Sequence, residues 1–129
     1  MATKRILIID DDIDLVEAMR LTLEGAGFEV IDAQEGKKGV EKIASGSPDL
    51  VILDVMMGTQ DEGFHIAYEI KNNPETSDIP LIMLTAVGQE TGFKFDKNKD
   101  EDFLPVNEFL EKPIDPDTLI ELVKKNLGQ

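Results

Sequence analysis

Short apolar runs rich in Val, Ile and Leu alternate along this chain with segments whose apolar residues repeat at helical spacing. A short apolar run bounded by polar residues is typical of a strand buried on both faces of a sheet. The alternation predicts an α/β fold, with a mostly parallel sheet, helices on both faces and right-handed crossovers. The expected strands are residues 6–9, 28–33, 50–53, 81–84 and, with a weaker pattern, 106–110.

The helical segments carry their own start and stop signals. In the first of them Val16, Met19 and Leu23 recur on one face, and a glycine follows as a stop. Asp115 is placed to cap the last helix, and Pro116 suits its first position. The expected helices are residues 12–26, 37–45, 63–71 and a final one that begins at Pro116.

One segment departs from the alternation. Residues 86–105 should hold a helix that crosses to the fifth strand, but they contain Gly88, Gly92 and a charged run at 97–102 with little apolar periodicity. This pattern predicts an irregular fourth crossover. We expect one domain over residues 1–129, with no effector domain, since a chain of 129 residues suits a single core.

Composition excludes several classes of protein. The 13 Lys and Arg against 27 Asp and Glu give a net charge of −14, which repels a phosphate backbone and makes direct nucleic-acid binding unexpected. The absence of cysteine excludes disulfides and thiolate metal sites. No apolar run is long enough to cross a membrane or to form a secretory signal, so we expect a cytoplasmic protein.

Polar residues follow the predicted strands at the points where they end. Asp10, Asp11 and Asp12 follow the first strand. Asp54, Thr85 and Lys112 end the third, fourth and fifth strands. Because the carboxyl ends of parallel strands lie along one edge of a sheet, where ligands bind, these residues are expected to meet there.

Each of these residue types has a chemical reason to be there. Crowded carboxylates repel one another, so at least one carboxyl pKa should be raised, and a hard cation such as Mg²⁺ would relieve the repulsion. Asp54, at the centre of the sheet, is placed to attack phosphorus as a carboxylate nucleophile, while Lys112 and Thr85 could bind phosphoryl oxygens. Asp11 and Asp12 have a second explanation, because Asp after a strand often caps the next helix.

The chain resembles the receiver domains of two-component response regulators nearly from end to end. The matching residues are Ile8–Ile9–Asp10–Asp11–Asp12, Pro48 to Met57, Pro80 to Ala86 and Phe109–Leu110–Glu111–Lys112–Pro113. The resemblance implies a flavodoxin-like five-stranded sheet of order 2-1-3-4-5, a fold for which a receiver is itself a standard example.

The resemblance also implies a function and a set of site residues. Asp54 would accept a phosphoryl group from a sensor histidine kinase or a phosphotransfer protein, and the change would switch a protein–protein interaction surface. Mg²⁺ would be bound by Asp11, Asp54 and the carbonyl of Met56, with Asp10 assisting through water. Thr85 and Lys112 would contact the phosphoryl group, Phe109 would be the switch aromatic, and the Lys112–Pro113 bond would be cis.

The chain departs from the family pattern in the loop after the third strand, where Gly58 replaces the usual proline, and in its long 85–112 segment. The lone histidine, His65, is expected on the surface of the third helix, without a phosphohistidine role.

Two alternatives remain at this point. One is an interaction module with a receiver fold that works without phosphorylation. The other is a phosphohydrolase of the haloacid dehalogenase type, in which Asp10 and Asp12 would form an Asp-x-Asp motif. Unlike a phosphohydrolase, a receiver catalyses only its own phosphorylation and dephosphorylation and is not a turnover enzyme.

Overall fold

The expected alternation of strands and helices is present in the computed structural model, which describes residues 3–54, 62–86 and 108–128. The strands are β1 (Arg5–Ile9), β2 (Glu29–Ala33), β3 (Leu50–Asp54), β4 (Leu81–Ala86) and β5 (Glu108–Lys112). The helices are α1 (Ile13–Gly25), α2 (Gly36–Gly46), α3 (Glu62–Asn72) and α5 (Pro116–Asn126). The irregular fourth crossover predicted for residues 87–105 lies outside the described residues.

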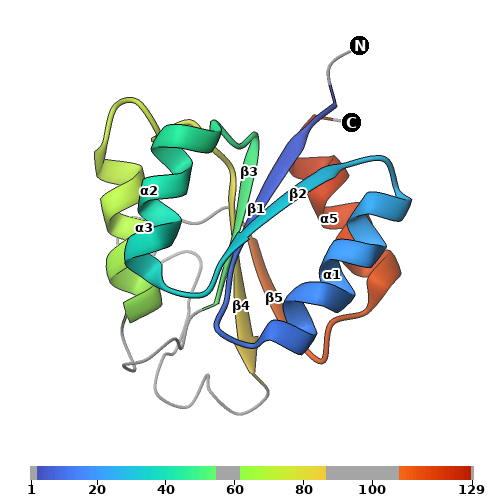
Figure 1. Cartoon of the computed structure of the whole chain (residues 1–129). Helices are drawn as coiled ribbons and strands as arrows, with labels where there is room; N and C mark the ends of the chain where they lie inside the picture. The colour runs from blue at the N-terminus through green and yellow to red at the C-terminus, as the bar shows by residue number, and fades with distance from the viewer. Residues whose placement is uncertain (1–2, 55–61, 87–107, 129) are drawn as a thin grey trace.

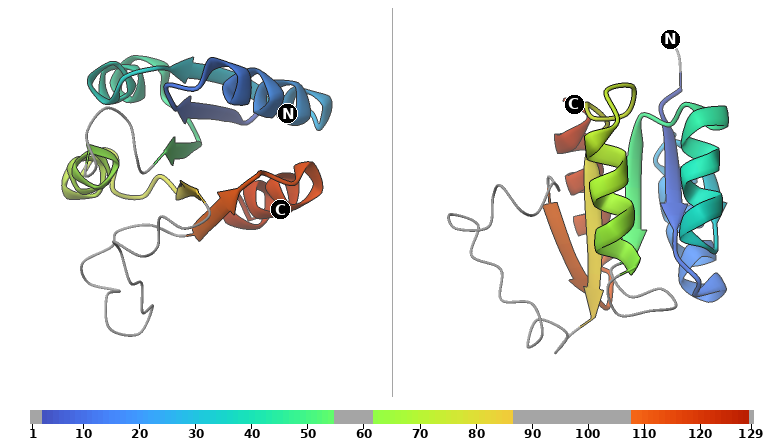
Figure 2. Two further views of the ribbon diagram at one scale, coloured as in Figure 1. Left: turned by 90° about the horizontal axis from the view of Figure 1, so that it is seen from below. Right: turned by 90° about the vertical axis from the view of Figure 1, so that its left-hand side faces the viewer.

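The five strands form one parallel sheet in the order β2-β1-β3-β4-β5, as predicted. Helices α1 and α5 cover one face and α2 and α3 cover the other, as Figures 1 and 2 show. The sheet is therefore the middle layer of three, and its inner strands are closed off from water on both faces.

Strand periodicity divides the core into two clusters. In β1 the side chains of Ile6 and Ile8 pack toward α1 and α5, whereas Leu7 and Ile9 pack toward α2 and α3. Because successive side chains point to opposite faces, an unbroken apolar strand serves both clusters. All five residues of β3, including Asp54 at its end, are buried. This uninterrupted burial explains why β3 is apolar up to Asp54 rather than alternating with polar residues.

Side-chain caps fix the starts of two helices. The carboxylate of Asp12 accepts a hydrogen bond from the Leu15 N–H at 3.2 Å, and that of Asp115 accepts one from the Thr118 N–H at 2.9 Å. The caps agree with the sequence interpretation of both residues.

The last strand differs from its predicted bounds. β5 runs from Glu108 to Lys112, so the predicted strand, residues 106–110, ends two residues too early. Its pairing with β4, which aligns Ile82 with Glu108 and Ala86 with Lys112, carries the strand past its apolar residues. The sheet partner, rather than local apolarity, therefore decides where β5 ends.

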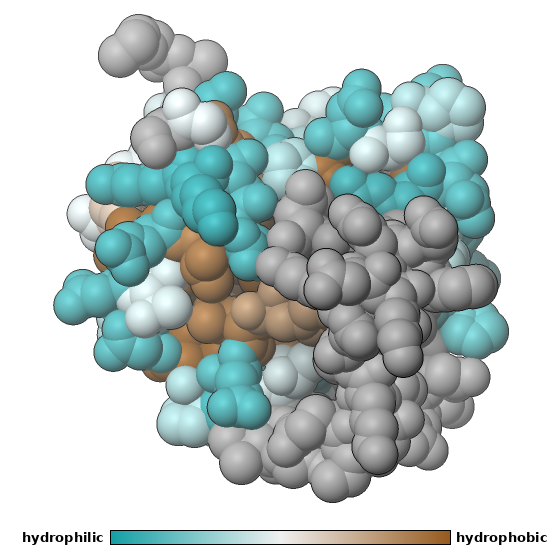
Figure 3. Space-filling model, turned by 180° about the vertical axis from the view of Figure 1, so that it is seen from behind, coloured by the Kyte–Doolittle hydropathy of each residue, from teal (hydrophilic) through white to brown (hydrophobic). Residues whose placement is uncertain are grey.

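The surface is mixed in character. The view from behind in Figure 3 shows hydrophilic residues around a smaller area of exposed hydrophobic surface. His65 is exposed, as expected for a residue on the outer side of α3. Among the described residues, no helix is long and apolar enough to cross a membrane.

Candidate functional site at the carboxyl edge of the sheet

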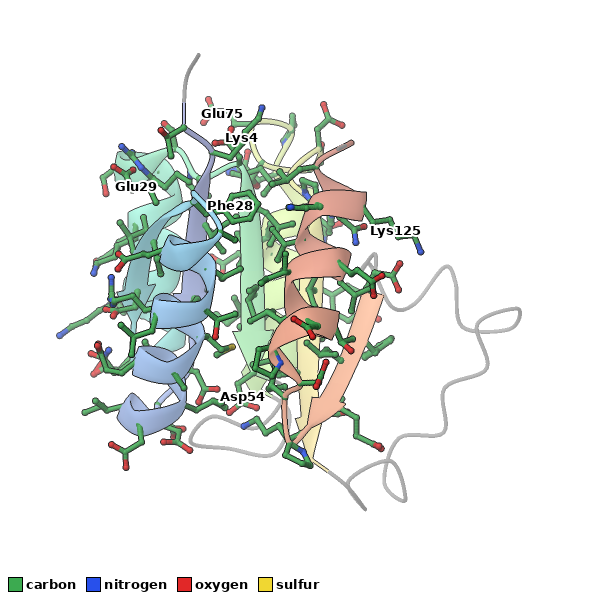
Figure 4. The ribbon with its side chains drawn as sticks, turned by 90° about the vertical axis from the view of Figure 1, so that its right-hand side faces the viewer. Lys4, Phe28, Glu29, Asp54, Glu75 and Lys125 are labelled. Atoms are coloured by element: carbon green, nitrogen blue, oxygen red, sulfur yellow. The ribbon has the colours of Figure 1, made fainter. Side chains whose placement is uncertain are left out.

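The strand register brings the predicted site residues to one end of the sheet. Ile9 lies beside Leu53, so Asp10 and Asp54 follow at the same level of neighbouring strands. Lys112 ends β5 beside Ala86 of β4, slightly farther along the edge. Figure 4 shows Asp54 at this end, with Lys4, Phe28, Glu29 and Glu75 at the opposite end.

Three carboxylates and one ammonium group meet at this edge. One oxygen from each of Asp10, Asp11 and Asp54 lies within 4.8 Å of the others. The Nζ atom of Lys112 lies 3.6 Å from an oxygen of Asp10 and 3.5 Å from an oxygen of Asp54. The formal charge of the cluster is −3 + 1 = −2, which a divalent cation would neutralise.

Asp10 is the most strongly perturbed member of the cluster. Its side chain is fully buried, and its pKa is raised from 3.8 to about 6. Burial is the main cause, because an ionised carboxylate loses its hydration, and the neighbouring Asp54 charge adds to it. The Asp12 N–H and Lys112 act in the opposite direction by favouring the ionised form. The prediction that crowding raises a carboxyl pKa therefore holds in direction, but desolvation contributes more than repulsion.

The two oxygens of Asp10 have different surroundings. Oδ1 accepts a hydrogen bond from the backbone N–H of Asp12 at 2.9 Å. Oδ2 is buried and accepts no hydrogen bond among the described residues, since the Lys112 Nζ atom lies 3.6 Å from it, beyond hydrogen-bond distance. A buried carboxylate oxygen without a donor is costly, and a bound cation would satisfy it. This oxygen, together with the three clustered carboxylates, fits a site for a hard divalent cation.

The three consecutive aspartates at the end of β1 have distinct positions. Asp10 is buried, whereas Asp11 and Asp12 are exposed. Asp11 joins the carboxylate cluster, and Asp12 caps α1 with its side chain while its N–H holds Asp10. The hydrogen bond from the Asp12 N–H to the Asp10 carboxylate was not predicted from the sequence.

Thr85 and Phe109 belong to the other face of the sheet. The register pairs Asp54 with Leu84, which belongs to the core cluster on the side of α1 and α5, so Asp54 faces that side. Lys112 follows Leu110 of the same cluster by two residues and therefore has the same orientation. Thr85 follows Met83 by two residues and therefore has the opposite orientation, as does Phe109, which is paired with Met83. Both side chains are half-buried. The structure thus gathers Asp10, Asp11, Asp54 and Lys112, with Thr85 and Phe109 as a second pair nearby.

Two other expectations concern the same edge. The Lys112–Pro113 peptide bond is cis, as the family resemblance implied. Met56, whose carbonyl was predicted as a metal ligand, lies outside the described residues, as does the loop around Gly58.

Comparison with known proteins gives a consistent result. The family model for the response regulator receiver domain matches residues 6–124. The chain is 36% identical over 93% of its length to the DNA-binding dual master transcriptional regulator RpaA of Synechocystis, of which it spans 47%. It is 32% identical over 96% of its length to PilH of Pseudomonas aeruginosa, of which it spans 98%.

A solved structure agrees with these matches. A response regulator from Chloroflexus aurantiacus, 32% identical, superposes with a TM-score of 0.83 over 99% of this chain and 100% of that chain. The chain spans about half the length of two transcriptional regulators that it matches, 47% of RpaA and 52% of PhoB of Pseudomonas aeruginosa. From the fold, the clustered strand-end residues and these matches together, we conclude that the chain belongs to the response regulator receiver domain family.

Proposed function

We propose that this chain is a stand-alone receiver, a phosphorylation-controlled switch that takes a phosphoryl group on Asp54 in a Mg²⁺-dependent reaction. The observation that carries the proposal is the cluster in which the Asp54 carboxylate lies beside Asp10, Asp11 and the Lys112 ammonium group at the end of a buried strand. Receivers are signalling domains that histidine kinases or phosphotransfer proteins phosphorylate. The match over nearly the whole of PilH supports the stand-alone arrangement.

The donor set suits Mg²⁺. Asp10, Asp11 and Asp54 offer only oxygen ligands, which this ion prefers, and the cluster has a charge of the size that the ion neutralises. The carbonyl of Met56 completes the proposed ligand set. When bound, Mg²⁺ would supply positive charge for the oxygens of the incoming phosphoryl group.

The side chains of the cluster divide the remaining work. An oxygen of Asp54 forms a bond to phosphorus while the bond from phosphorus to the donor's histidine nitrogen breaks, and that nitrogen keeps the electron pair. Lys112 balances the negative charge of the new phosphoryl group, since its Nζ atom already lies 3.5 Å from Asp54. The Thr85 hydroxyl moves toward a phosphoryl oxygen and donates a hydrogen bond to it. Phe109, on the same face of the sheet, changes position with Thr85, and this changes the interaction surface.

The position of Asp12 speaks against the phosphohydrolase alternative. An Asp-x-Asp mechanism needs the second aspartate in the reaction centre, but Asp12 is exposed and its carboxylate caps α1. An interaction module that ignores phosphorylation would have no need for the clustered carboxylates and Lys112. Such a module would bind its partner with the same affinity before and after phosphorylation, whereas the affinity of the proposed switch would change, so a binding measurement distinguishes the two.

Phosphorylation by a small donor tests the proposal directly. The protein is incubated with acetyl phosphate and Mg²⁺ and its intact mass is measured, with a second sample in chelator. We expect one acid-stable, base-labile phosphoryl adduct with Mg²⁺ and none in chelator. Asp54→Ala should give no adduct, whereas Asp14→Ala, at an exposed position of α1, should behave like wild type. An adduct of equal yield in Asp54→Ala would disprove the assignment.

A further inference from the structure

The outer edge of β2 is an unpaired strand edge in the described part of the chain. β2 is the first strand in the sheet order, with β1 on one side only. The Glu29 N–H donates to the carbonyl of Lys4, and the Ala33 carbonyl accepts from the Asp10 N–H. Residues 29, 31 and 33 therefore direct their peptide groups toward β1, and Val30 and Asp32 direct theirs outward, because the direction alternates along a strand.

Two cations cover the outward carbonyl groups. Arg20 of α1 donates from Nη1 to the Val30 carbonyl at 2.9 Å, and Lys42 of α2 donates from Nζ to the Asp32 carbonyl. The two helices lie on opposite sides of the sheet, so the edge is covered from both layers (Figure 1). Each of the two outward carbonyls thus has a charged side-chain donor in place of a neighbouring strand.

Arg20 is held in position by acidic groups. Its guanidinium pairs with Asp32 on the edge strand itself and lies 3.4 Å from Glu17 and 3.9 Å from Glu24 on its own helix. The Arg20 side chain is only 23% exposed. An arginine fixed in this way occupies the edge more persistently than a freely rotating surface side chain would.

We propose that Arg20 and Lys42 close the β2 edge against strand addition, and that the partner they exclude is the β2 strand of a second copy of this chain. An exposed strand edge is a template for pairing, and charged side chains are one means by which proteins block it. Two β2 strands related by a twofold axis would be self-complementary, since Val30 of one copy would face Asp32 of the other. By covering this edge, Arg20 and Lys42 keep the chain from self-association there, on the side of the sheet remote from β4 and β5.

The test removes both cations and measures association. Arg20→Met/Lys42→Met is compared with Lys37→Met/Lys38→Met, which makes the same change in charge and also introduces two methionines, at two exposed positions of α2. Sedimentation analysis over a concentration series, in moderate salt to screen the acidic charge, gives the association constant. The double variant uncovers two carbonyls on each copy, which allows four more hydrogen bonds across the symmetric pair. At the lower end of the range, about 0.5 kcal/mol for each bond, the association constant should rise by about 30-fold over the control.

Two further measurements identify the surface. In a β2–β2 dimer the outward amide protons of Val30 and Asp32 should become protected from hydrogen exchange, while in wild type they exchange faster than that of Ile31. Adding Asp32→Pro to the double variant removes the outward Asp32 N–H, which makes no hydrogen bond to β1. The change removes a donor from the β2–β2 pair and leaves the sheet intact, so this variant should be monomeric.

The outcomes are distinct. If the double variant associates no more than the Lys37/Lys38 control, or if it associates without protection at Val30 and Asp32, the proposal is wrong. Should Arg20→Met prevent folding, judged by circular dichroism, Lys42→Met alone provides the comparison. That variant uncovers the Asp32 carbonyl, and we expect about a fivefold rise in its association constant over Lys38→Met. An unchanged constant would likewise overturn the proposal.

Discussion

Neutralising Asp10 should stabilise the metal-free protein at neutral pH. Asp10 is fully buried and its pKa is raised from 3.8 to about 6, so the folded state opposes ionisation of this carboxyl group. The shift of about two units corresponds to about 3 kcal/mol of unfolding free energy that wild type lacks when Asp10 is ionised. Asp10→Asn removes this penalty and can keep the hydrogen bond from the Asp12 N–H. The melting temperature should rise on the order of 10 °C.

The pH dependence follows from the direction of the shift. Between about pH 4 and pH 6 the folded protein binds more protons at Asp10 than the unfolded chain does, so wild-type stability falls as pH rises through this window. Asn does not titrate. The stability advantage of Asp10→Asn over wild type should therefore be small near pH 4, grow through pH 6 and be complete at pH 7.5.

Urea unfolding in chelator at a series of pH values measures this advantage. Asp11→Asn is the matched control, because Asp11 contributes a carboxylate to the same cluster but is exposed, and its effect should stay within about 0.5 kcal/mol. Added Mg²⁺ should stabilise wild type more than Asp10→Asn, since the ion binds the folded state through the carboxylate that the variant lacks.

Two results would refute the reasoning. One is an advantage of Asp10→Asn that is the same at pH 4.5 and pH 7.5, which would show that titration of Asp10 is not its source. The other is a folded Asp10→Asn protein that is less stable than wild type in chelator at pH 7.5. Either would mean that Lys112 and the Asp12 N–H compensate fully for the burial of this carboxylate.

Three further substitutions test other parts of the structure. Lys112→Met should raise Mg²⁺ affinity on the order of tenfold, measured by calorimetry, because it removes a competing positive charge from the carboxylates; an affinity equal to that of wild type would contradict the cluster geometry. Asp115→Ala should lower the free energy of unfolding by about 1 kcal/mol through loss of the α5 cap, whereas Asp115→Asn should lose less in the same urea titration. Gly39→Ala places a Cβ 2.4 Å from Ile9 Cδ1 and should destabilise by about 1–3 kcal/mol. Ile9→Val removes that atom, so additive losses in a double-mutant cycle would argue against this contact.

Local sequence patterns determined most of the architecture. Four-residue apolar runs such as Leu50 to Leu53 identify buried strands, and an apolar face such as that of Val16, Met19 and Leu23 identifies an amphipathic helix. The positions of Asp10 and Asp54 immediately at strand ends then predict a shared edge, because parallel strands end on the same side. These inferences hold because strand and helix periods are properties of consecutive residues.

Tertiary contacts decided what these patterns leave open. The sequence places Asp10, Asp11 and Asp12 in one run and leaves a cap role open for either of the last two. Packing buries Asp10, exposes Asp11 in the cluster and makes Asp12 the cap. Pairing with β4 extends β5 to Lys112, beyond the predicted apolar stretch.

The β2 edge is a second feature that no local pattern predicts. Arg20 and Lys42 are ordinary charged residues of helices in the sequence, and they reach the Val30 and Asp32 carbonyls only because α1 and α2 pack on opposite faces of the same strand. Burial and such long-range contacts depend on which segments become neighbours after folding. The sequence therefore determined which residues could form the site, and the tertiary structure decided the separate environment, and so the separate chemistry, of each one.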